Sequence, residues 1–564
     1  MHTKRVAVWA GAIALAAIAA YGQTEITAFD GNGQISWDDP GGTGTHYAVQ
    51  WSASGLSNWM SWQDAEASLA GLGATGTAAV PMFYRVVAQD PTYEPTETYT
   101  YYYKDLPLFD PLTPLSNDEM RITFMGSMIP LPVRLAQAEM SIFVEVGWSN
   151  DPSDVVYGGR ARDQFIFDCG AGCSANFAAA KVGFRRMDKV FINHLHGDHM
   201  SDLTHIYCFG PAGDRKSPLY VWGSSPSGVA CPTDPGDVYS DDGVVYDDGT
   251  SNFCANLRDA WRWHSESFGF QGTCSSNYVP PTKESWGLPH DPVPVGNDDP
   301  RDAFAVVPIE LDWSEVGGQA YSNADTGVRI THFPVIHCRR GSMGYKLDWQ
   351  TPDGTNLSMI YTSDTKPETN CIEQAKNGGR GVDVFIHEMV VPPAVWAYKN
   401  MGLAAAPTTN DANYAEYQAT VQGLTYVQNS SHTPQGAFGY ILSQLISNNV
   451  QPRLTVATHF PVADDTVASA FDSVKAHCPD VEMGKDIVWS FDLMVLRVFP
   501  DRIEQCRADV SKYCFNPPVQ LPTGMLPPKY NDGAGSGDPF YQIDTNAAIP
   551  AVSGGVTNFR VDGY

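Results

Sequence analysis

Short apolar runs, each followed closely by polar side chains, recur through the middle of this chain. Runs of this length are typical of buried strands, and they predict strands at residues 165–167, 190–192, 358–361, 384–386 and 454–457. A different spacing follows Thr433-Pro434, where apolar residues recur three and four positions apart as far as Ile446. This spacing predicts a helix that starts at the proline. This part of the chain is therefore expected to hold both strands and helices.

The N-terminal part has another pattern. In residues 1–22, Lys4 and Arg5 precede an apolar run with small residues after it, which is typical of a secretory signal peptide. Residues 23–90 alternate apolar and polar positions between turn signals, and predict a small all-β module. Residues 91–118, rich in Pro, Thr and Tyr, are interpreted as a linker. We therefore expect bacterial-type export to the periplasm or the medium, with an uncleaved anchor as the alternative; no later segment approaches the length of a membrane span.

The chain has 564 residues, which is long enough for two domains. We assign residues 119–514 to the main domain and 515–564 to an irregular C-terminal tail. An insertion at about 208–302 is dense in Gly, Pro, Asp and Ser. Its aspartates between 234 and 248 are interpreted as a solvated acidic loop; a calcium site is the alternative, although the spacing matches no EF-hand loop.

Cysteine usage bears on the same insertion. Four of the eleven cysteines lie in it, and in an exported protein they predict disulfides that pin it to the domain. Because eleven is odd, at least one thiol is unpaired or joins another chain. Cys169, beside a glycine turn, is the candidate for the free thiol.

Charge excludes one class of partner. The sequence has 63 acidic and 35 basic residues, a formal net charge of −28. Such a surface repels polyanions, whereas nucleic-acid binding depends on basic side chains that neutralise phosphates. We expect no nucleic-acid partner, and the sequence leaves the oligomeric state open.

Three imidazoles and a carboxylate follow the strand at 190–192, in the sequence His194-Leu195-His196-Gly197-Asp198-His199. Side chains alternate along a strand, so His194 and His196 point to the same side, and the chain then turns at the glycine. Two ligand pairs at such a corner suit two metal ions a few ångströms apart. The competing interpretation is a polar turn rich in histidine, which is disfavoured because only 14 of the 564 residues are histidines.

This motif resembles the His-x-His-x-Asp-His signature of the metallo-β-lactamase fold superfamily, in particular the branch that holds ribonuclease Z and the arylsulfatase-like hydrolases. Two further segments resemble landmarks of the family: Phe124-Met125-Gly126-Ser127 its first strand and glycine turn, and residues 165–170 its Asp-x-Gly strand. The resemblance runs from about residue 121 to about residue 498. It implies an α/β fold, an αββα sandwich, here preceded by a small fibronectin-like all-β sandwich.

The resemblance also implies a complete ligand set at the ends of strands: His194, His196, Asp198, His199, His337, Asp364 and His459. In the family pattern Asp364 touches both ions, and Asp168 orients a ligand histidine. Nitrogen and oxygen ligands suit two zinc ions, with manganese or iron as alternatives. The spacing from His337 to Gly344 is a residue longer than in the family, so His332 stays as a rival to His337.

Three residues are expected to act on the substrate or on water. Asp198 orients or deprotonates the water, and His432, just before the predicted helix, lies where the family has a proton donor. For His387 a catalytic role and a strand-end histidine held by a hydrogen bond are both open. The resulting hypothesis is an exported dinuclear metal hydrolase of a small or surface-accessible phosphate or sulfate ester. The alternatives are a lactone or amide hydrolase, and a non-catalytic extracellular structural or binding protein on the same scaffold.

Overall fold

The computed structural model describes residues 106–130, 137–148, 161–215, 217–231, 243–265 and 303–513, together with the backbone of the strands between residues 23 and 89. The expected signal peptide, most of the linker and the C-terminal tail lie outside the described residues. The signal peptide and the tail therefore stay predictions.

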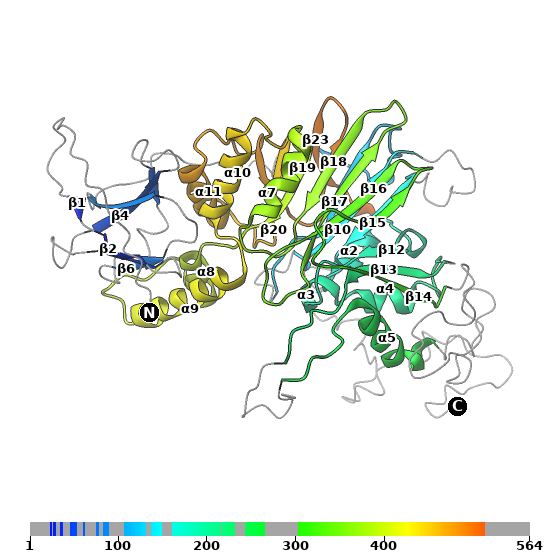
Figure 1. Ribbon diagram of the computed structural model, residues 1–564, viewed down its shortest axis with the longest axis horizontal. Helices are drawn as coiled ribbons and strands as arrows, with labels where there is room; N and C mark the ends of the chain where they lie inside the picture. The colour runs from blue at the N-terminus through cyan, green and yellow to red at the C-terminus, as the bar shows by residue number, and fades with distance from the viewer. Residues whose placement is uncertain are drawn as a thin grey trace, which may run out of the picture. The chain divides into compact units, whose positions relative to one another are not determined.

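Two mixed sheets form the main domain (Figure 1). The first sheet has nine strands in the order β14 (Val306–Leu311), β13 (Leu219–Ser224), β12 (Lys189–Phe191), β11 (Asp163–Phe167), β10 (Ser141–Val146), β9 (Met120–Gly126), β22 (Met494–Val498), β23 (Ile503–Ala508) and β8 (Leu108–Phe109). The second has seven, in the order β15 (Gly318–Asn323), β16 (Val328–Pro334), β17 (Met343–Gln350), β18 (Asn356–Tyr361), β19 (Val384–Glu388), β20 (Leu454–Thr458) and β21 (Ile487–Trp489). The α/β class and the strands expected at the five apolar runs are confirmed.

Three apolar clusters show how these sheets are layered. One joins inward-facing residues of both sheets, such as Phe167 and Tyr361. A second joins the first sheet to α2 (Cys173–Ala179), α4 (Leu203–Phe209) and α5 (Thr250–Ala260). A third joins the second sheet to α7 (Thr369–Lys376), α10 (Gln435–Ser447) and α11 (Asp464–His477). Side chains alternate accordingly, since Phe165 and Phe167 enter the first cluster and Ile166 the second. The layers are therefore helix, sheet, sheet and helix, as expected.

The direction of the strands decides where polar side chains gather. In the first sheet β11, β12, β13 and β14 run parallel, and in the second β18, β19, β20 and β21 do. Strand β16 runs in the same sense as β18, because both are antiparallel to β17. In parallel sheets, ligand sites form outside the carboxyl ends of the strands. The loops that follow β11, β12, β16, β18, β19 and β20 carry the residues discussed below.

Two predicted boundaries need correction. Strand β13 and helix α5 lie inside the stretch expected as an insertion, and β13 pairs on both sides within the first sheet. The stretch at 208–302 is therefore partly core. Strand β8 lies in the expected linker and pairs with β23, so the linker ends inside the main domain. The N-terminal strands form two small sheets, in the orders β1-β7-β4-β5 and β2-β3-β6, and their packing as a sandwich stays a prediction.

The cysteines are not joined as expected. Nine of them are described and all nine are free thiols, including Cys208, Cys231 and Cys254 of the stretch at 208–302. The expectation that disulfides pin this stretch is therefore wrong for these three. Cys208 and Cys254 belong to the apolar cluster under α4 and α5, where a thiol packs as a small hydrophobic side chain. Cys169, the candidate for the free thiol, is free, but so are the other eight described cysteines, so nothing singles it out.

A helical hairpin and a helix follow β19. The hairpin is α8 (Pro393–Asn400) and α9 (Tyr414–Ser431), and α10 begins one residue after the position expected. Pro434 caps α10 with an extended backbone and so lies outside the helix. Across the described part of the chain, no helix combines the length and the apolar character that a membrane crossing needs.

Arg215 connects α4 to the first sheet from a fully buried position. Its guanidinium donates hydrogen bonds to the carbonyl oxygens of Ile206 (2.8 Å) and Tyr207 (3.3 Å) in α4 and of Ala303 (3.1 Å) before β14. Burial lowers the pKa of Arg215 to about 10, so it stays charged at neutral pH. A buried guanidinium whose hydrogen bonds go to carbonyl groups depends on those bonds.

We expect Arg215→Met to lower the free energy of unfolding by about 2–4 kcal/mol, because three buried carbonyls lose a charged donor. Urea denaturation followed by far-UV circular dichroism measures the change. The matched control is Arg380→Met at an exposed arginine, which should stay within about 0.5 kcal/mol of the parent. Equal stability of the two variants would show that Arg215 does not anchor α4.

Candidate metal centre

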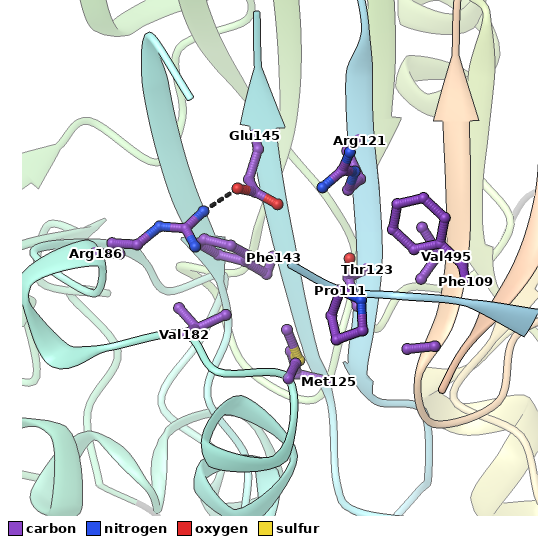
Figure 2. A pocket seen from close by; sticks show the side chains of 12 residues that line it. Phe109, Pro111, Arg121, Thr123, Met125, Phe143, Glu145, Val182, Arg186 and Val495 are labelled. Carbon is purple, nitrogen blue, oxygen red and sulfur yellow. Dashed lines mark hydrogen bonds and ion pairs between the residues drawn. The ribbon is translucent and has the colours of Figure 1, made fainter. Parts of the chain in front are cut away.

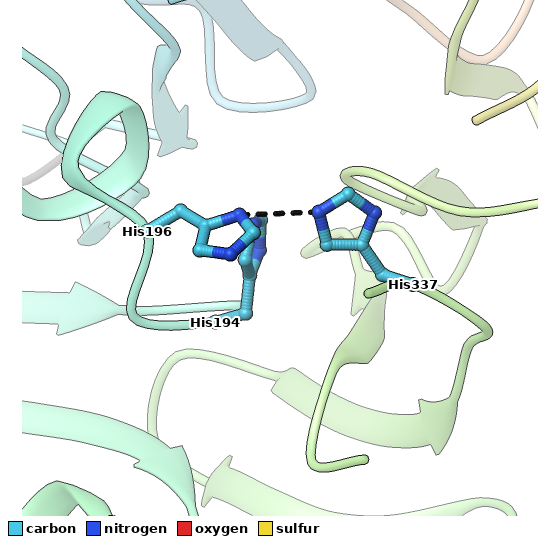
Figure 3. Close-up of side chains that lie close together, drawn as sticks. All are labelled: His194, His196 and His337. Atoms are coloured by element: carbon cyan, nitrogen blue, oxygen red, sulfur yellow. Dashed lines mark hydrogen bonds between the residues drawn. The ribbon is translucent and has the colours of Figure 1, made fainter. Parts of the chain in front are cut away.

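Three histidine rings face one another at the edge of the two sheets (Figure 3). The Nε2 atom of His194 lies 3.1 Å from Nδ1 of His196, and Nε2 of His337 lies 3.1 Å from the same Nδ1. His194 and His196 follow β12, and His337 follows β16, so the group joins one loop from each sheet. Three nitrogens that converge in this way match the ligand geometry of a divalent ion such as zinc.

A second group lies beside the first and is more deeply buried. It consists of Asp198, His199, Asp364 and His459, whose ligand atoms all lie within 4.8 Å of one another. His199 Nε2 is 3.3 Å from a carboxylate oxygen of Asp198 and from one of Asp364. His459 Nε2 is 3.2 Å from Asp198 Oδ2. The other oxygen of Asp364, Oδ2, lies 3.8 Å from His337 Nε2, so this carboxylate lies between the two groups.

The structure thus brings together all seven side chains expected as ligands. The rival residue, His332, lies within β16 of the second sheet. Its Nε2–H donates to the carbonyl oxygen of Asp312, which directly follows β14, at 2.8 Å. Between the two candidates, the geometry favours His337.

The second group has the character of a cation site. His199 Nε2 and Asp364 Oδ1 are buried and make no hydrogen bond, although they face each other. Burial opposes the charged form of His199, yet Asp364, Asp198 and Asp168 together raise its pKa well above the usual range. Burial lowers the pKa of His194 well below its usual range, which keeps that imidazole neutral, as a ligand must be. These residues therefore fit divalent metal ions.

Asp168 fixes the orientation of His199. Its Oδ2 accepts a hydrogen bond from His199 Nδ1 at 2.8 Å and others from the hydroxyls of Tyr361 (2.8 Å) and Ser363 (3.2 Å). Its Oδ1 accepts from the backbone N–H of Asn193 at 2.9 Å. A carboxylate held this firmly sets which nitrogen of the imidazole faces the ligand group.

Three non-glycine residues at this edge have left-handed backbone conformations. Asp168 has φ 57°, Ser363 φ 55° and His459 φ 58°, and each follows the end of a strand. Such conformations cost on the order of 1–3 kcal/mol each and persist where the surroundings enforce them. Here they turn each strand end sharply into the site.

The loop that carries His337 is held from two sides. His337 Nδ1 donates to the carbonyl oxygen of Ser431, at the end of α9, at 2.9 Å. Two residues further along the loop, Arg339 forms an ion pair with Asp248 at 2.9 Å and donates to the hydroxyl of Ser227 at 3.2 Å. Asp248 is one of the aspartates interpreted as a solvated acidic loop, and the structure gives it this local role.

His432 and Glu388 form a pair next to the second group. His432 Nδ1 lies 3.0 Å from both carboxylate oxygens of Glu388 and 3.8 Å from Asp364 Oδ2. Although burial opposes protonation, the charges of Glu388 and Asp364 raise the pKa of His432 to about 10. The imidazole is therefore protonated at neutral pH, as a general acid requires. Glu388 was not among the residues expected from the sequence to act, although it directly follows His387 at the end of its strand.

His387 points to the other face of β19. Its ring packs against Phe385 and Phe438, and its Nδ1–H donates to the carbonyl oxygen of Glu388 at 2.8 Å. Burial lowers its pKa to about 4, so the ring is neutral. His387 joins none of the ligand groups found among the described residues. Of the two roles left open for it, the geometry favours a histidine held within the structure.

A small cavity lies on the far side of the first sheet (Figure 2). Its volume is about 10 Å³, and its walls include Phe109, Phe143 and an ion pair between Arg186 and Glu145. That volume holds about one water molecule. This cavity is too small for a substrate and does not include any of the ligand residues.

Comparison with known proteins gives local matches. No protein-family model matches the chain. Ribonuclease Z of Treponema denticola is 30% identical over 107 residues, which are 19% of this chain and 29% of that protein. Ribonuclease Z of Archaeoglobus fulgidus is 35% identical over 102 residues, 18% of this chain and 28% of that protein. The chain thus spans less than a third of the length of these curated relatives.

A solved structure is also similar to this chain. The metallo-β-lactamase fold protein YhfI of Bacillus subtilis is 13% identical, and the alignment covers 68% of this chain and 100% of that one with a TM-score of 0.36. The sequence matches to ribonucleases Z, the His-x-His-x-Asp-His motif and the seven converging side chains agree with one another. They support the resemblance of this chain to the metallo-β-lactamase fold superfamily.

Proposed function

We propose that this protein is a metal-dependent hydrolase that cleaves a phosphate or sulfate ester. The observation that carries the proposal is the position of His432: a protonated imidazole held by Glu388 lies beside Asp364, the carboxylate between two groups of metal-ligating side chains. A cation site and a proton donor at one place are the two parts that ester hydrolysis needs.

Each part has a separate task. Divalent ions, of which zinc is the first candidate and manganese or iron the alternatives, supply Lewis-acid activation of water and of the ester when they are bound. Asp198 orients the attacking water or accepts its proton. Glu388 keeps the proton on His432, which delivers it to the oxygen of the leaving group. Asp168, through His199, keeps the ligand set in register.

The names of the curated relatives are the reason for preferring a phosphate or sulfate ester as the substrate. The curated relatives are named ribonucleases, and ribonucleases act on phosphodiester bonds. A lactone or amide is the alternative substrate on the same site. A non-catalytic structural or binding role on this scaffold is the other alternative. The assays of metal content and hydrolysis described below distinguish it from an enzyme. We further propose that the protein is exported, on the pattern of residues 1–22, which N-terminal sequencing of the mature chain would check.

Metal removal should abolish turnover. We expect a chelator to stop hydrolysis of bis-p-nitrophenyl phosphate, and added zinc or manganese to restore it. Asp364→Asn should lower activity by more than about 100-fold and reduce the metal content, since even residues that only orient ligands cost 10–100-fold. The matched control is Asp325→Asn at an exposed aspartate, which should change neither. Freshly purified protein that contains no metal and hydrolyses no ester would favour the non-catalytic role.

The role of His432 separates catalysis from metal binding. We expect His432→Gln to keep the metal content and to lose about 10²–10⁴-fold in turnover for a substrate with a poor leaving group. The loss should be smaller for p-nitrophenolate, which needs little protonation. Glu388→Gln removes the charge that raises the pKa of His432, so the fall of kcat at high pH should begin at a lower pH. His459→Ala, in contrast, should lose metal and activity for every leaving group; the same loss for both leaving groups in His432→Gln would exclude a proton donor.

Nucleic-acid binding should be weak despite the names of the relatives. The net charge of −28 opposes the counterion release on which such binding depends. We expect no shift of a transfer RNA by the protein in a gel-shift assay at physiological salt. A tight complex whose affinity falls steeply with salt would show a basic surface that the total charge hides, and would favour a ribonuclease.

A further inference from the structure

His459 differs from two other expected ligands in how its ring is held. His199 Nδ1 is hydrogen-bonded to Asp168, and His337 Nδ1 to the carbonyl oxygen of Ser431. His459 Nδ1 is buried and has no hydrogen-bond partner among the described residues. A histidine that binds a metal ion through one ring nitrogen is normally oriented by a hydrogen bond of the other nitrogen. The orientation of His459 must therefore come from its backbone and its packing.

The backbone that follows His459 is held by a loop of the other sheet. His459 itself has the left-handed φ of 58°, where the chain turns away from the end of β20. The next residue, Phe460, donates its backbone N–H to the carbonyl oxygen of Ser127 at 3.0 Å. Ser127 directly follows β9, so the first sheet supports the end of a strand in the second sheet.

Gln137 makes two more hydrogen bonds to the same turn. Its Nε2–H donates to the carbonyl oxygen of Phe460 at 3.0 Å, and its Oε1 accepts from the backbone N–H of Val462 at 3.0 Å. A carbonyl oxygen only accepts and a backbone N–H only donates, so these partners fix which end of the amide faces which. One buried side chain thereby joins the backbone on both sides of Pro461.

Gln137 is itself held in one orientation. Its second amide hydrogen goes to the hydroxyl of Ser127 at 2.9 Å, and that hydroxyl donates to Asp492 Oδ1 at 2.9 Å. Asp492 Oδ2 accepts from the backbone N–H of Ala138 at 2.6 Å and from the side-chain amide of Asn176 at 2.7 Å. A buried network whose members are satisfied in this way is rigid. The turn after β20 is therefore fixed to a rigid support.

We propose that Gln137 is a positioning residue for the second group. By holding the backbone after His459, it sets where the imidazole of His459 lies, and so the affinity of the second group for a divalent ion. Gln137 belongs to neither group of ligands and acts through His459. The inference rests on the proposed function, because it requires the second group to hold an ion, but its test measures metal binding without turnover.

Equilibrium dialysis of the full-length protein against Zn²⁺, with the bound zinc counted by mass spectrometry, tests this role. We expect Gln137→Met to keep one ion at the affinity of the wild type and to bind the other about 10–100-fold more weakly, which is the usual cost of losing a residue that orients a ligand. The matched control is Gln164→Met, at a buried glutamine of β11 outside both groups, which should bind both ions like the wild type. Circular dichroism checks that each variant is folded.

A double variant shows whether Gln137 acts through His459. His459→Ala removes a ligand of the second group and should leave one tightly bound ion. Adding Gln137→Met to this variant should not change the affinity for the remaining ion, because the side chain that Gln137 positions is already gone. A merely structural role of Gln137 would weaken the remaining ion in this background as well.

Hydrogen exchange in the wild type needs no variant, and it decides the role of Gln137 if Gln137→Met does not fold. In the metal-free protein the backbone N–H of Val462 should exchange slowly, because Gln137 holds it before any ion binds. Mass spectrometry of peptides that contain Val462 measures the exchange.

The outcomes are distinguishable. A Gln137→Met variant that binds both ions like the wild type overturns the role of Gln137 and leaves the proposed function standing. A weakening that persists in the His459→Ala background, or a Val462 N–H that exchanges freely in the metal-free protein, has the same meaning. A wild type that binds no ion overturns the proposed function as well.

Discussion

Four buried carboxylates face one small volume between the two sheets, and the rest of the site is arranged around this charge. They are Asp168, Asp198, Asp364 and Glu388, none of them more than 7% exposed. Burying a carboxylate is costly unless it is paired or hydrogen-bonded. Asp168 is satisfied by an imidazole, two hydroxyls and a backbone N–H, and Glu388 by His432 and the backbone N–H of Thr365. Asp198 and Asp364 have mainly imidazoles as partners, and a divalent cation held there would complete the compensation of their charge.

Much of this arrangement could be predicted from the sequence, because metal ligands at strand ends leave a local pattern. The motif from His194 to His199 and the apolar runs before Asp364 and His459 pointed to side chains that the structure does bring together at one edge. The class of the fold followed from the resemblance to a known family. The resemblance to a known family, and not the pattern, indicated which expected ligands from separate loops lie together. This grouping depends on the order of the strands in two sheets.

The rest could not be predicted for physical reasons that particular residues show. His387 and Glu388 are adjacent on β19 and so point to opposite faces; the side chain that reaches the site could be chosen only once Phe385 was known to face the helices. Disulfide bonds were expected because export was expected. A buried thiol in an apolar cluster, however, needs no partner. The extent of the insertion was misjudged because β13 is a short apolar strand among turn-forming residues.

The end of α9 couples the positions of two candidate site residues, His337 and His432. The carbonyl group of Ser431 holds His337, and the next residue is His432. One peptide unit thus positions both His337, an expected ligand on the loop after β16, and His432, the expected proton donor. The tip of the hairpin, between α8 and α9, is exposed, and a change of length there need not move either residue. Any change that shifts the last turn of α9 would move His337 and His432 together, so the base of the hairpin tolerates less change than its tip.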